Sequence, residues 1–179
     1  MNQPHILIVG DPGVGKSTLI RRLLEYNSRP VCGFITKMEP SEVNGLRSIY
    51  VHPAAQPEHA WEYTGENLIG TCDTKIHNIN LDAFDTLGVE YLSALPQNGL
   101  ILMDELGFME AGSVPFTQRV LEVLDGDIPV LAAVKSRADI PFLEQVRSHP
   151  KATVCLITPE NREELFHRLL PIIQSIWEE

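Results

Sequence analysis

One short stretch near the start of the chain has the residue types and spacing that hold phosphate. The run GDPGVGKS fits the pattern GxxxxGK[ST], with Gly10, Gly15, Lys16 and Ser17 at its fixed positions. Glycines let a loop wrap closely, so that successive backbone N–H groups point at phosphate oxygens. A helix that follows the loop aims its positive end at the same place. The lysine can then reach the β- and γ-phosphates, and the hydroxyl can ligate Mg²⁺.

The surroundings of this loop fit the same chemistry. An apolar run at residues 5–10 precedes it, and apolar residues at helical spacing follow it over residues 19–24. Asp11 and Pro12 also suit a turn that makes no specific contact with a ligand. Lys16 is a candidate catalytic residue as well as a phosphate-binding one. The predicted nucleotide-binding residues of the loop are Gly10, Asp11, Pro12, Gly13, Val14, Gly15, Lys16, Ser17 and Thr18.

A cluster of acids ends a second apolar run, LILMDELGFME, at residues 100–110. An aspartate at the end of such a strand holds Mg²⁺ in enzymes with a phosphate loop, and Asp104 has this position. Its contact with the metal would pass largely through water, because Mg²⁺ dehydrates reluctantly. Glu105 suits the orientation and deprotonation of an attacking water. Alternatively, it lies behind the catalytic residues or on the surface and does not touch the substrate. Glu110 either lines the site or begins a helix.

These residues need a scaffold that brings the ends of two strands together. In the second half of the chain, continuously apolar runs alternate with segments of helical periodicity, which indicates a parallel sheet covered by helices on both faces. The expected strands are residues 5–10, 29–38, 46–52, 99–105, 128–135 and 152–158, and the expected helices are residues 15–26, 81–95, 114–125, 139–149 and 161–177.

The predicted fold class is therefore α/β, a three-layer sandwich around a mostly parallel sheet. The turn SEVNG at residues 41–45 predicts an antiparallel hairpin insertion, and residues 53–80 have room for one or two short strands. We expect Ser113 and Asp139 to cap helices, and Pro171 to kink the last one. Because no repeat or linker interrupts the pattern, residues 1–179 are expected to form a single domain.

Composition limits the classes of partner. The chain has 14 basic and 24 acidic residues, a formal net charge of −10, which makes a poor general binder of nucleic acid or of anionic membranes. Three widely spaced cysteines form no CxxC pair, as in reduced intracellular proteins. No apolar stretch approaches the roughly 20 residues of a membrane span. We expect a soluble cytoplasmic protein with no nucleic-acid or membrane partner.

Several motifs occur in the order of one known family. GDPGVGKSTLI, GFIT, GLRSIYV, LILMDELGFME and TPENREEL resemble the small P-loop nucleoside-triphosphatase family, known from thermophiles and as the human cancer-related NTPase. The resemblance runs from Ile6 to Leu165, and DE[IL]GxME is its most specific part. It implies a RecA-like P-loop core and Mg²⁺-dependent hydrolysis of ATP, GTP and related triphosphates. The reaction that members catalyse in the cell is unsettled, and a protein partner is compatible with the resemblance.

The resemblance also implies roles for residues outside the two main motifs. Asn161 and Arg162 match positions expected to meet the base, or they are a helix cap and a surface cation. Arg47 matches a hairpin arginine that faces either the phosphates or solvent. Thr36 matches a strand motif usually followed by acids, but here Lys37 and Met38 follow, which puts a role for those acids in doubt.

The strand that ends near residue 135 adds two cations. Either Lys135 or Arg137 could meet the γ-phosphate as a cationic finger. Their positions alone do not say which of the two side chains reaches the phosphate.

Three functions remain in competition. Hydrolysis of nucleoside triphosphates leads, with Lys16 and Glu105 as catalytic residues and Ser17 and Asp104 as metal ligands. A nucleotide or small-molecule kinase is the first alternative, but its candidate lid, residues 53–80, contains no arginine and a single lysine, Lys75. A nucleotide-dependent switch protein is the second. The missing NKxD and LSGGQ motifs argue against a Ras-like GTPase and an ABC transporter.

Overall fold

The computed structural model describes the backbone of residues 4–178 and the side chains of residues 4–175. One eight-stranded sheet runs through the molecule in the order β5-β4-β3-β2-β6-β7-β1-β8. Adjacent strands from β2 to β8 in this order are parallel, and β3, β4 and β5 extend the sheet in antiparallel fashion. The strands are β1 (His5–Gly10), β2 (Val31–Val43), β3 (Leu46–Pro53), β4 (Leu68–Cys72), β5 (Ile76–His77), β6 (Leu100–Leu106), β7 (Val130–Lys135) and β8 (Ala152–Leu156).

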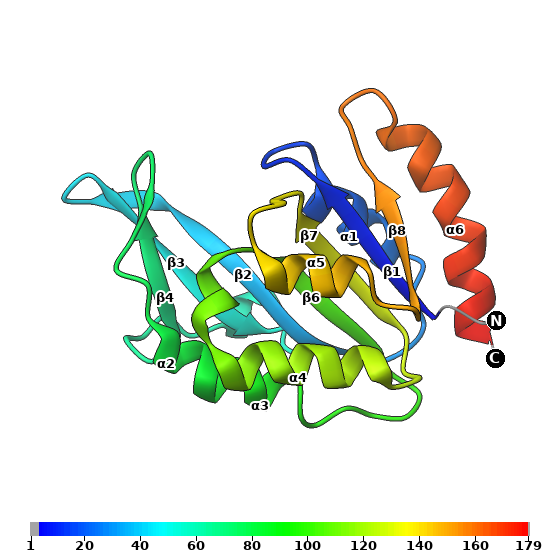
Figure 1. The fold of residues 1–179 in the computed structure, drawn as a ribbon, viewed down its shortest axis with the longest axis horizontal. Helices are drawn as coiled ribbons and strands as arrows, with labels where there is room; N and C mark the ends of the chain where they lie inside the picture. Colours follow the sequence, from blue (N-terminus) through cyan, green and yellow to red (C-terminus); the bar gives the residue numbers. More distant parts are fainter. Residues whose placement is uncertain (1–3, 179) are drawn as a thin grey trace.

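Helices cover both faces of the sheet, as predicted, and Figure 1 shows the resulting layers. Apolar side chains of α1 and α6 pack on one face, and those of α2 to α5 pack on the other. The helices are α1 (Lys16–Leu24), α2 (Leu81–Ala83), α3 (Val89–Tyr91), α4 (Val114–Asp125), α5 (Pro141–Arg147) and α6 (Arg162–Glu178), with a π-helical turn η2 (Phe84–Gly88) and 3₁₀ turns η1 (Glu58–Ala60) and η3 (Met109–Gly112).

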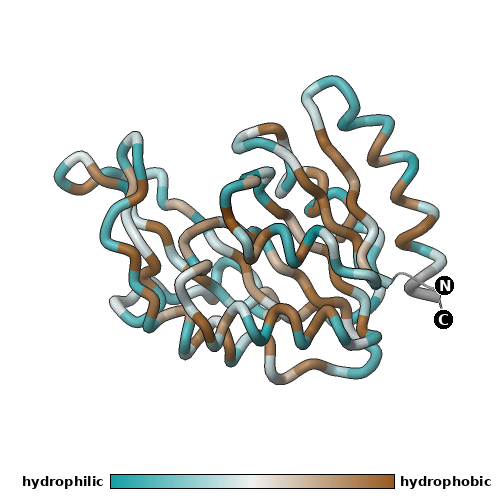
Figure 2. The backbone as a smooth tube through the Cα atoms, in the orientation of Figure 1, coloured by the Kyte–Doolittle hydropathy of each residue, from teal (hydrophilic) through white to brown (hydrophobic). Residues whose placement is uncertain are grey.

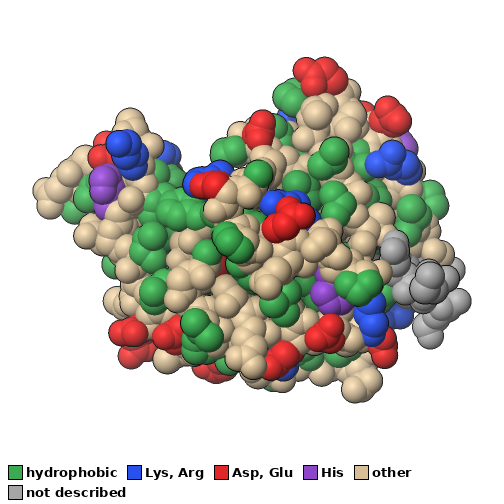
Figure 3. All heavy atoms as spheres, viewed as in Figure 1, with side chains coloured by type: hydrophobic (Ala, Val, Ile, Leu, Met, Phe, Trp, Pro, Cys, Tyr) green, Lys and Arg blue, Asp and Glu red, His purple; other side chains and the backbone are tan. Residues whose placement is uncertain are grey.

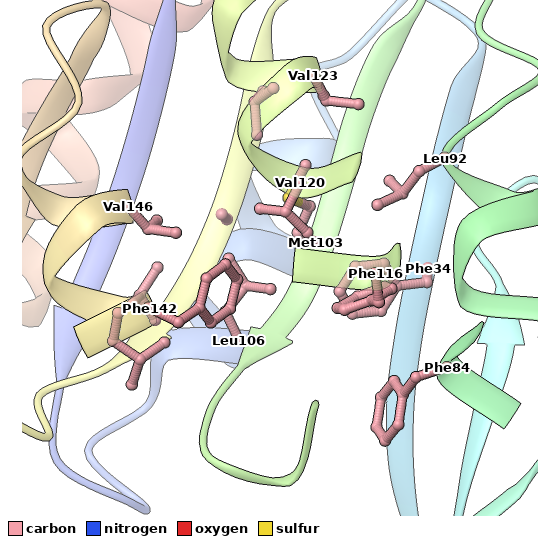
Figure 4. Packing of buried hydrophobic residues seen from close by; sticks show 14 of the residues in the cluster. Phe34, Phe84, Leu92, Met103, Leu106, Phe116, Val120, Val123, Phe142 and Val146 are labelled. Carbon is pink, nitrogen blue, oxygen red and sulfur yellow. The ribbon is translucent and has the colours of Figure 1, made fainter. Parts of the chain in front are cut away.

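Three phenylalanines bring α4 and the η2 turn onto the sheet (Figure 4). The Phe116 ring lies 5.3 Å from that of Phe34 and 5.4 Å from that of Phe84, measured between centroids. All three side chains are fully buried. Such aromatic pairs contribute about 0.5–1.5 kcal/mol beyond the burial of their area. In Figure 2 the inner strands of the sheet carry much brown, whereas the outer part of the β2–β3 hairpin and many connecting loops are white or teal.

The predicted hairpin is present and longer than expected. β2 is a strand of 13 residues that starts inside the parallel part of the sheet, beside β6. It then continues outward with β3 as an antiparallel ribbon, which projects from the body of the molecule (Figure 1). The ribbon turns at Asn44 and Gly45, both of which have positive φ. Those left-handed conformations suit the Asn-Gly pair of a tight hairpin.

Two predicted caps have different outcomes. Ser113 caps α4 as expected, because its Oγ accepts a 3.3 Å hydrogen bond from the N–H of Phe116. The prediction for Asp139 is wrong: α5 begins at Pro141, after Ile140, and the Asp139 carboxylate pairs with Arg137 at 2.6 Å. A proline at the first helical position sets the start of a helix by its fixed φ, so this end forms without a side-chain cap.

The last helix runs as one element from Arg162 to Glu178, with Pro171 inside it. Within residues 4–178, none of the helices combines the length and the apolar character that crossing a membrane requires.

Candidate functional site

The phosphate-binding loop joins β1 to α1 at the carboxyl edge of the parallel strands. Open α/β sheets bind ligands at this edge. Gly15 precedes the helix with φ of 103°, a left-handed conformation that disfavours any residue with a side chain. The loop therefore turns sharply into α1, and the positive end of that helix faces the loop.

Lys16 is the first residue of α1, and its side chain is only 4% exposed. Its Nζ donates to the carbonyls of Gly10 at 2.9 Å and Asp11 at 2.8 Å. The same atom lies 3.4 Å from Oε2 of Glu105. A buried ammonium requires such partners, and they hold the charge of Lys16 over the loop.

Asp104 meets the phosphate loop through Ser17, whose hydroxyl donates a 2.7 Å hydrogen bond to Asp104 Oδ1. Burial raises the pKa of Asp104 to about 6, although the hydrogen bond from Ser17 acts in the opposite direction. A buried carboxylate oxygen and a hydroxyl oxygen side by side are the hard donors that Mg²⁺ prefers. The two residues therefore fit a magnesium site that would be completed by water and phosphate oxygens.

Glu105 reaches the same site because β6 is irregular at this residue. Asp104 pairs with Ala133 of β7 and Leu106 pairs with Val134, so Glu105 has no residue opposite. A bulge of this kind re-aims a side chain, and bulges are frequent beside active sites. The peptide bond between Asp104 and Glu105 is cis.

Thr36 of β2 holds the backbone of this irregular segment. Its hydroxyl donates to the carbonyl of Asp104 at 3.4 Å and accepts from the N–H of Glu105 at 3.3 Å. The resemblance had marked Thr36 only as part of a strand motif. Its contacts fix the two acids relative to β2, independently of the residues that follow it.

These groups surround a cavity of about 420 Å³, within the range of small-molecule sites. Figure 3 shows the surface hollowed between the projecting hairpin and the loops at the carboxyl edge. The cavity is lined by loop residues and by side chains from three strands: Pro12, Gly13, Gly15, Lys16, Ser17, Thr18, Thr36, Met38, Asp104, Glu105 and Lys135.

The two residues expected to meet the base differ in placement. Arg162 lies against the phosphate loop, since a β-carbon built on Gly15 would be 3.1 Å from its Cδ. The Asn161 side chain is engaged in the turn before α6, where Oδ1 accepts from the Thr158 N–H at 2.8 Å and Nδ2 donates to the Leu156 carbonyl at 2.9 Å. Arg162 is thus beside the loop, and Asn161 shapes the turn that carries it.

Glu110 does not line the cavity. It is 4% exposed and accepts a hydrogen bond from the N–H of Gly107, which closes the turn after β6. Burial raises the pKa of Glu110 to about 7. Of the two interpretations that the sequence left open, its position in η3 favours a structural role in that turn.

Lys135 and Arg137 have different partners. Lys135 Nζ lies 3.4 Å from Oε1 of Glu105, inside the site. Arg137 forms an ion pair with Asp139 at 2.6 Å, and its guanidinium lies over the Phe108 ring, 5.6 Å from the centroid.

Arg47 is remote from both of these cations. It lies on the projecting hairpin, opposite Glu42 of β2 and Cys72 of β4, and it does not line the phosphate cavity. The structure does not bring it to the loop.

Arg147 supports the site in a way that the sequence did not indicate. From α5 it donates to the carbonyl of Lys135 at 3.0 Å and to that of Arg137 at 3.0 Å. It thereby fixes the loop that follows β7. Its place in an amphipathic helix gave no signal of this role, because a surface arginine has the same pattern.

Known proteins resemble this chain over most of its length. A family model described as NTPase matches residues 5–170. The nucleoside-triphosphatase THEP1 of Methanocaldococcus jannaschii is 33% identical over 93% of this chain and 95% of its own length. The cancer-related nucleoside-triphosphatase homolog of Mus musculus is 28% identical over 96% of this chain and 97% of its own. The crystal structure of THEP1 from Aquifex aeolicus superposes with a TM-score of 0.74 at 23% identity, covering 95% of this chain and 99% of the other.

Proposed function

The chain belongs to the NTPase family, and on that premise we propose that it is an Mg²⁺-dependent phosphohydrolase of ATP, GTP and related nucleoside triphosphates. One observation carries the proposal. The carboxylate of Glu105 lies 3.4 Å from the ammonium of Lys16, beside the Ser17–Asp104 pair. The residues that we assign as general base, phosphate-binding cation and metal ligands therefore line a single cavity.

The residues have distinct roles in the proposed reaction. Lys16 and the N–H groups of the loop hold the β- and γ-phosphates. Ser17 and Asp104 would hold Mg²⁺, which supplies neutralisation of the phosphate charge. Glu105 orients a water and accepts its proton while the water oxygen attacks the γ-phosphorus. The bond from that phosphorus to the bridging oxygen breaks, and the nucleoside diphosphate leaves with phosphate as the second product.

The placement of residues 53–80 supports hydrolysis over phosphoryl transfer to a second substrate. A kinase excludes water from the γ-phosphate, commonly with a closing segment that carries cations. None of these residues lines the phosphate cavity in the described structure, and β4 and β5 lie at the far edge of the sheet. In the described residues, this segment therefore contributes no cation to the phosphate cavity.

Phosphate release from Mg-ATP without any acceptor, measured beside label transfer to a panel of nucleosides, tests the proposal. Glu105→Gln should lower phosphate release by about 100-fold or more, the scale of a lost general base, while ATP still binds. Glu90→Gln on the exposed side of α3 is the matched control and should behave as wild type. An unchanged rate of phosphate release in Glu105→Gln, or a wild-type rate that depends largely on an added nucleoside acceptor, would refute the hydrolase proposal.

A further inference from the structure

Lys135 has a fixed place between the two motifs of the site. It is the last residue of β7, which lies between β1 and β6 in the sheet. Its backbone pairs with Gly10, where the phosphate loop begins, and Arg147 binds its carbonyl. The base of the Lys135 side chain is therefore held beside the loop by the sheet and by α5.

The side chain of Lys135 is also confined. Its stem passes close to Gly107, where a built β-carbon would be 3.1 Å from Lys135 Cδ, and its Nζ lies 5.9 Å from the centre of the Phe108 ring. Only 23% of the side chain is exposed. The ammonium is thus directed at Glu105, on the wall of the phosphate cavity.

One carboxylate holds two ammonium groups in this arrangement. Oε1 of Glu105 is 3.4 Å from Lys135 Nζ, and Oε2 is 3.4 Å from Lys16 Nζ. A γ-phosphate carries more negative charge than a carboxylate and has three free oxygens, so it competes well for both cations. Arg137 is no rival for this role, because two of its nitrogens bind Asp139 at 2.6 and 2.7 Å.

We propose that Lys135 binds the γ-phosphate and thereby gives the site a preference for nucleoside triphosphates over diphosphates. The inference rests on the proposed function, in which Lys16 and the loop hold the β-phosphate. A nucleoside diphosphate has no γ-phosphate, so Lys135 stays paired with Glu105. A triphosphate draws the Lys135 ammonium away, and Oε1 of Glu105 becomes free to accept a proton from water. The same contact thus selects the substrate and releases the base.

Equilibrium binding of ADP and of β,γ-imido ATP, both with Mg²⁺, tests the inference without turnover. Lys135→Ala should weaken binding of the imido analogue roughly ten- to hundred-fold, the scale of a lost charged hydrogen bond. Its affinity for ADP should change by less than about twofold. Lys135→Arg should retain part of the preference. Lys75→Ala removes the same charge from the exposed turn between β4 and β5 and should change neither affinity.

The same substitution in a Glu105→Gln background distinguishes direct contact between Lys135 and the γ-phosphate from an indirect effect, in which Lys135 only neutralises the charge of Glu105. If Lys135 binds the γ-phosphate, Lys135→Ala should reduce the preference equally when Glu105→Gln is present. The inference is overturned if that loss vanishes in the Glu105→Gln background, if both nucleotides weaken together, or if neither does. Triphosphate preference that depends on Lys135, in a chain that releases no phosphate from ATP, would refute hydrolysis and leave the role of Lys135 intact.

Discussion

The hydroxyl of Ser17 donates a hydrogen bond of 2.7 Å to Oδ1 of Asp104, although the two residues are 87 positions apart in the chain. The contact exists because β1 and β6 both run parallel to β7, which lies between them, so that the strand preceding Ser17 and the strand carrying Asp104 end at the same edge. Both residues line the cavity, where they would hold a divalent cation that neutralises phosphate charge.

This pair predicts a strict requirement for the Asp104 carboxylate. Asp104→Asn keeps the size of the side chain but removes the negative charge, so Mg²⁺-dependent phosphate release should fall by about 100-fold or more. Ser17→Ala should reduce the rate less, and the double variant should be no worse than Asp104→Asn, because the two act on one ion. Phosphate release is measured across a Mg²⁺ titration. Ser93→Ala, exposed on the molecule, is the control, and additive losses would contradict a shared site.

Glu110 predicts a pH-dependent difference in stability. Burial raises its pKa from 4.5 to about 7, so between these pH values the folded chain holds a proton that the unfolded chain has released. The contribution of Glu110 to the free energy of unfolding is full below pH 4.5. It declines as the pH rises to 7, by up to about 1.4 kcal/mol per pH unit. Glu110→Gln removes this titration and can still accept a hydrogen bond from Gly107.

Urea unfolding of both proteins at pH 5, 6 and 7 checks this prediction. The stability of Glu110→Gln relative to wild type should rise with pH across this range. Burial lowers the pKa of His5 and of His52, to about 4 for the latter, which acts in the opposite direction in both proteins and cancels in the difference. The charges that face Glu110 are those of Lys135 and Glu105. A difference that stays flat with pH would rule out a buried, titrating Glu110.

Gly33 predicts a position in β2 that tolerates no side chain. Its φ is +99°, and a built β-carbon would lie 2.0 Å from the carbonyl oxygen of Leu102 on β6. Gly33→Ala should cost about 3 kcal/mol or more, which corresponds to a melting temperature lower by roughly 6–12 °C. Gly65→Ala is the matched control, since no atom lies within 4 Å of its built β-carbon and its φ is not in the left-handed region. Equal melting temperatures for the two variants would contradict this packing.

Local sequence carries much of the fold and the centre of the site. Apolar runs and helical periodicity are properties of single segments, and they predict the parallel strands and most helices correctly. The phosphate loop and Asp104 are also local patterns, each at the end of an apolar run. Their meeting follows from the rule that parallel strands end at one edge.

The remainder depends on contacts between segments that no local pattern records. Lys135 and Arg137 look equivalent in sequence, and their partners separate them: Lys135 lies beside Glu105, whereas Arg137 pairs with Asp139. Asp139 does not cap α5, because the helix begins two residues later, at Pro141. The bulge at Glu105 depends on the register between β6 and β7, and the role of Arg147 depends on where α5 packs.

The position of β1 between two strands from the second half of the chain has a consequence for how the protein is made. β1 leaves the ribosome before both of its neighbours, β7, which ends at Lys135, and β8, which begins at Ala152. Contacts this distant in sequence form late and slow the folding of a domain. A nascent chain that stops short of β7 leaves β1 unpaired, and its apolar side chains remain open to aggregation and to chaperones. The phosphate loop, which follows β1, can therefore take its final shape only after β7 and β8 have been synthesised.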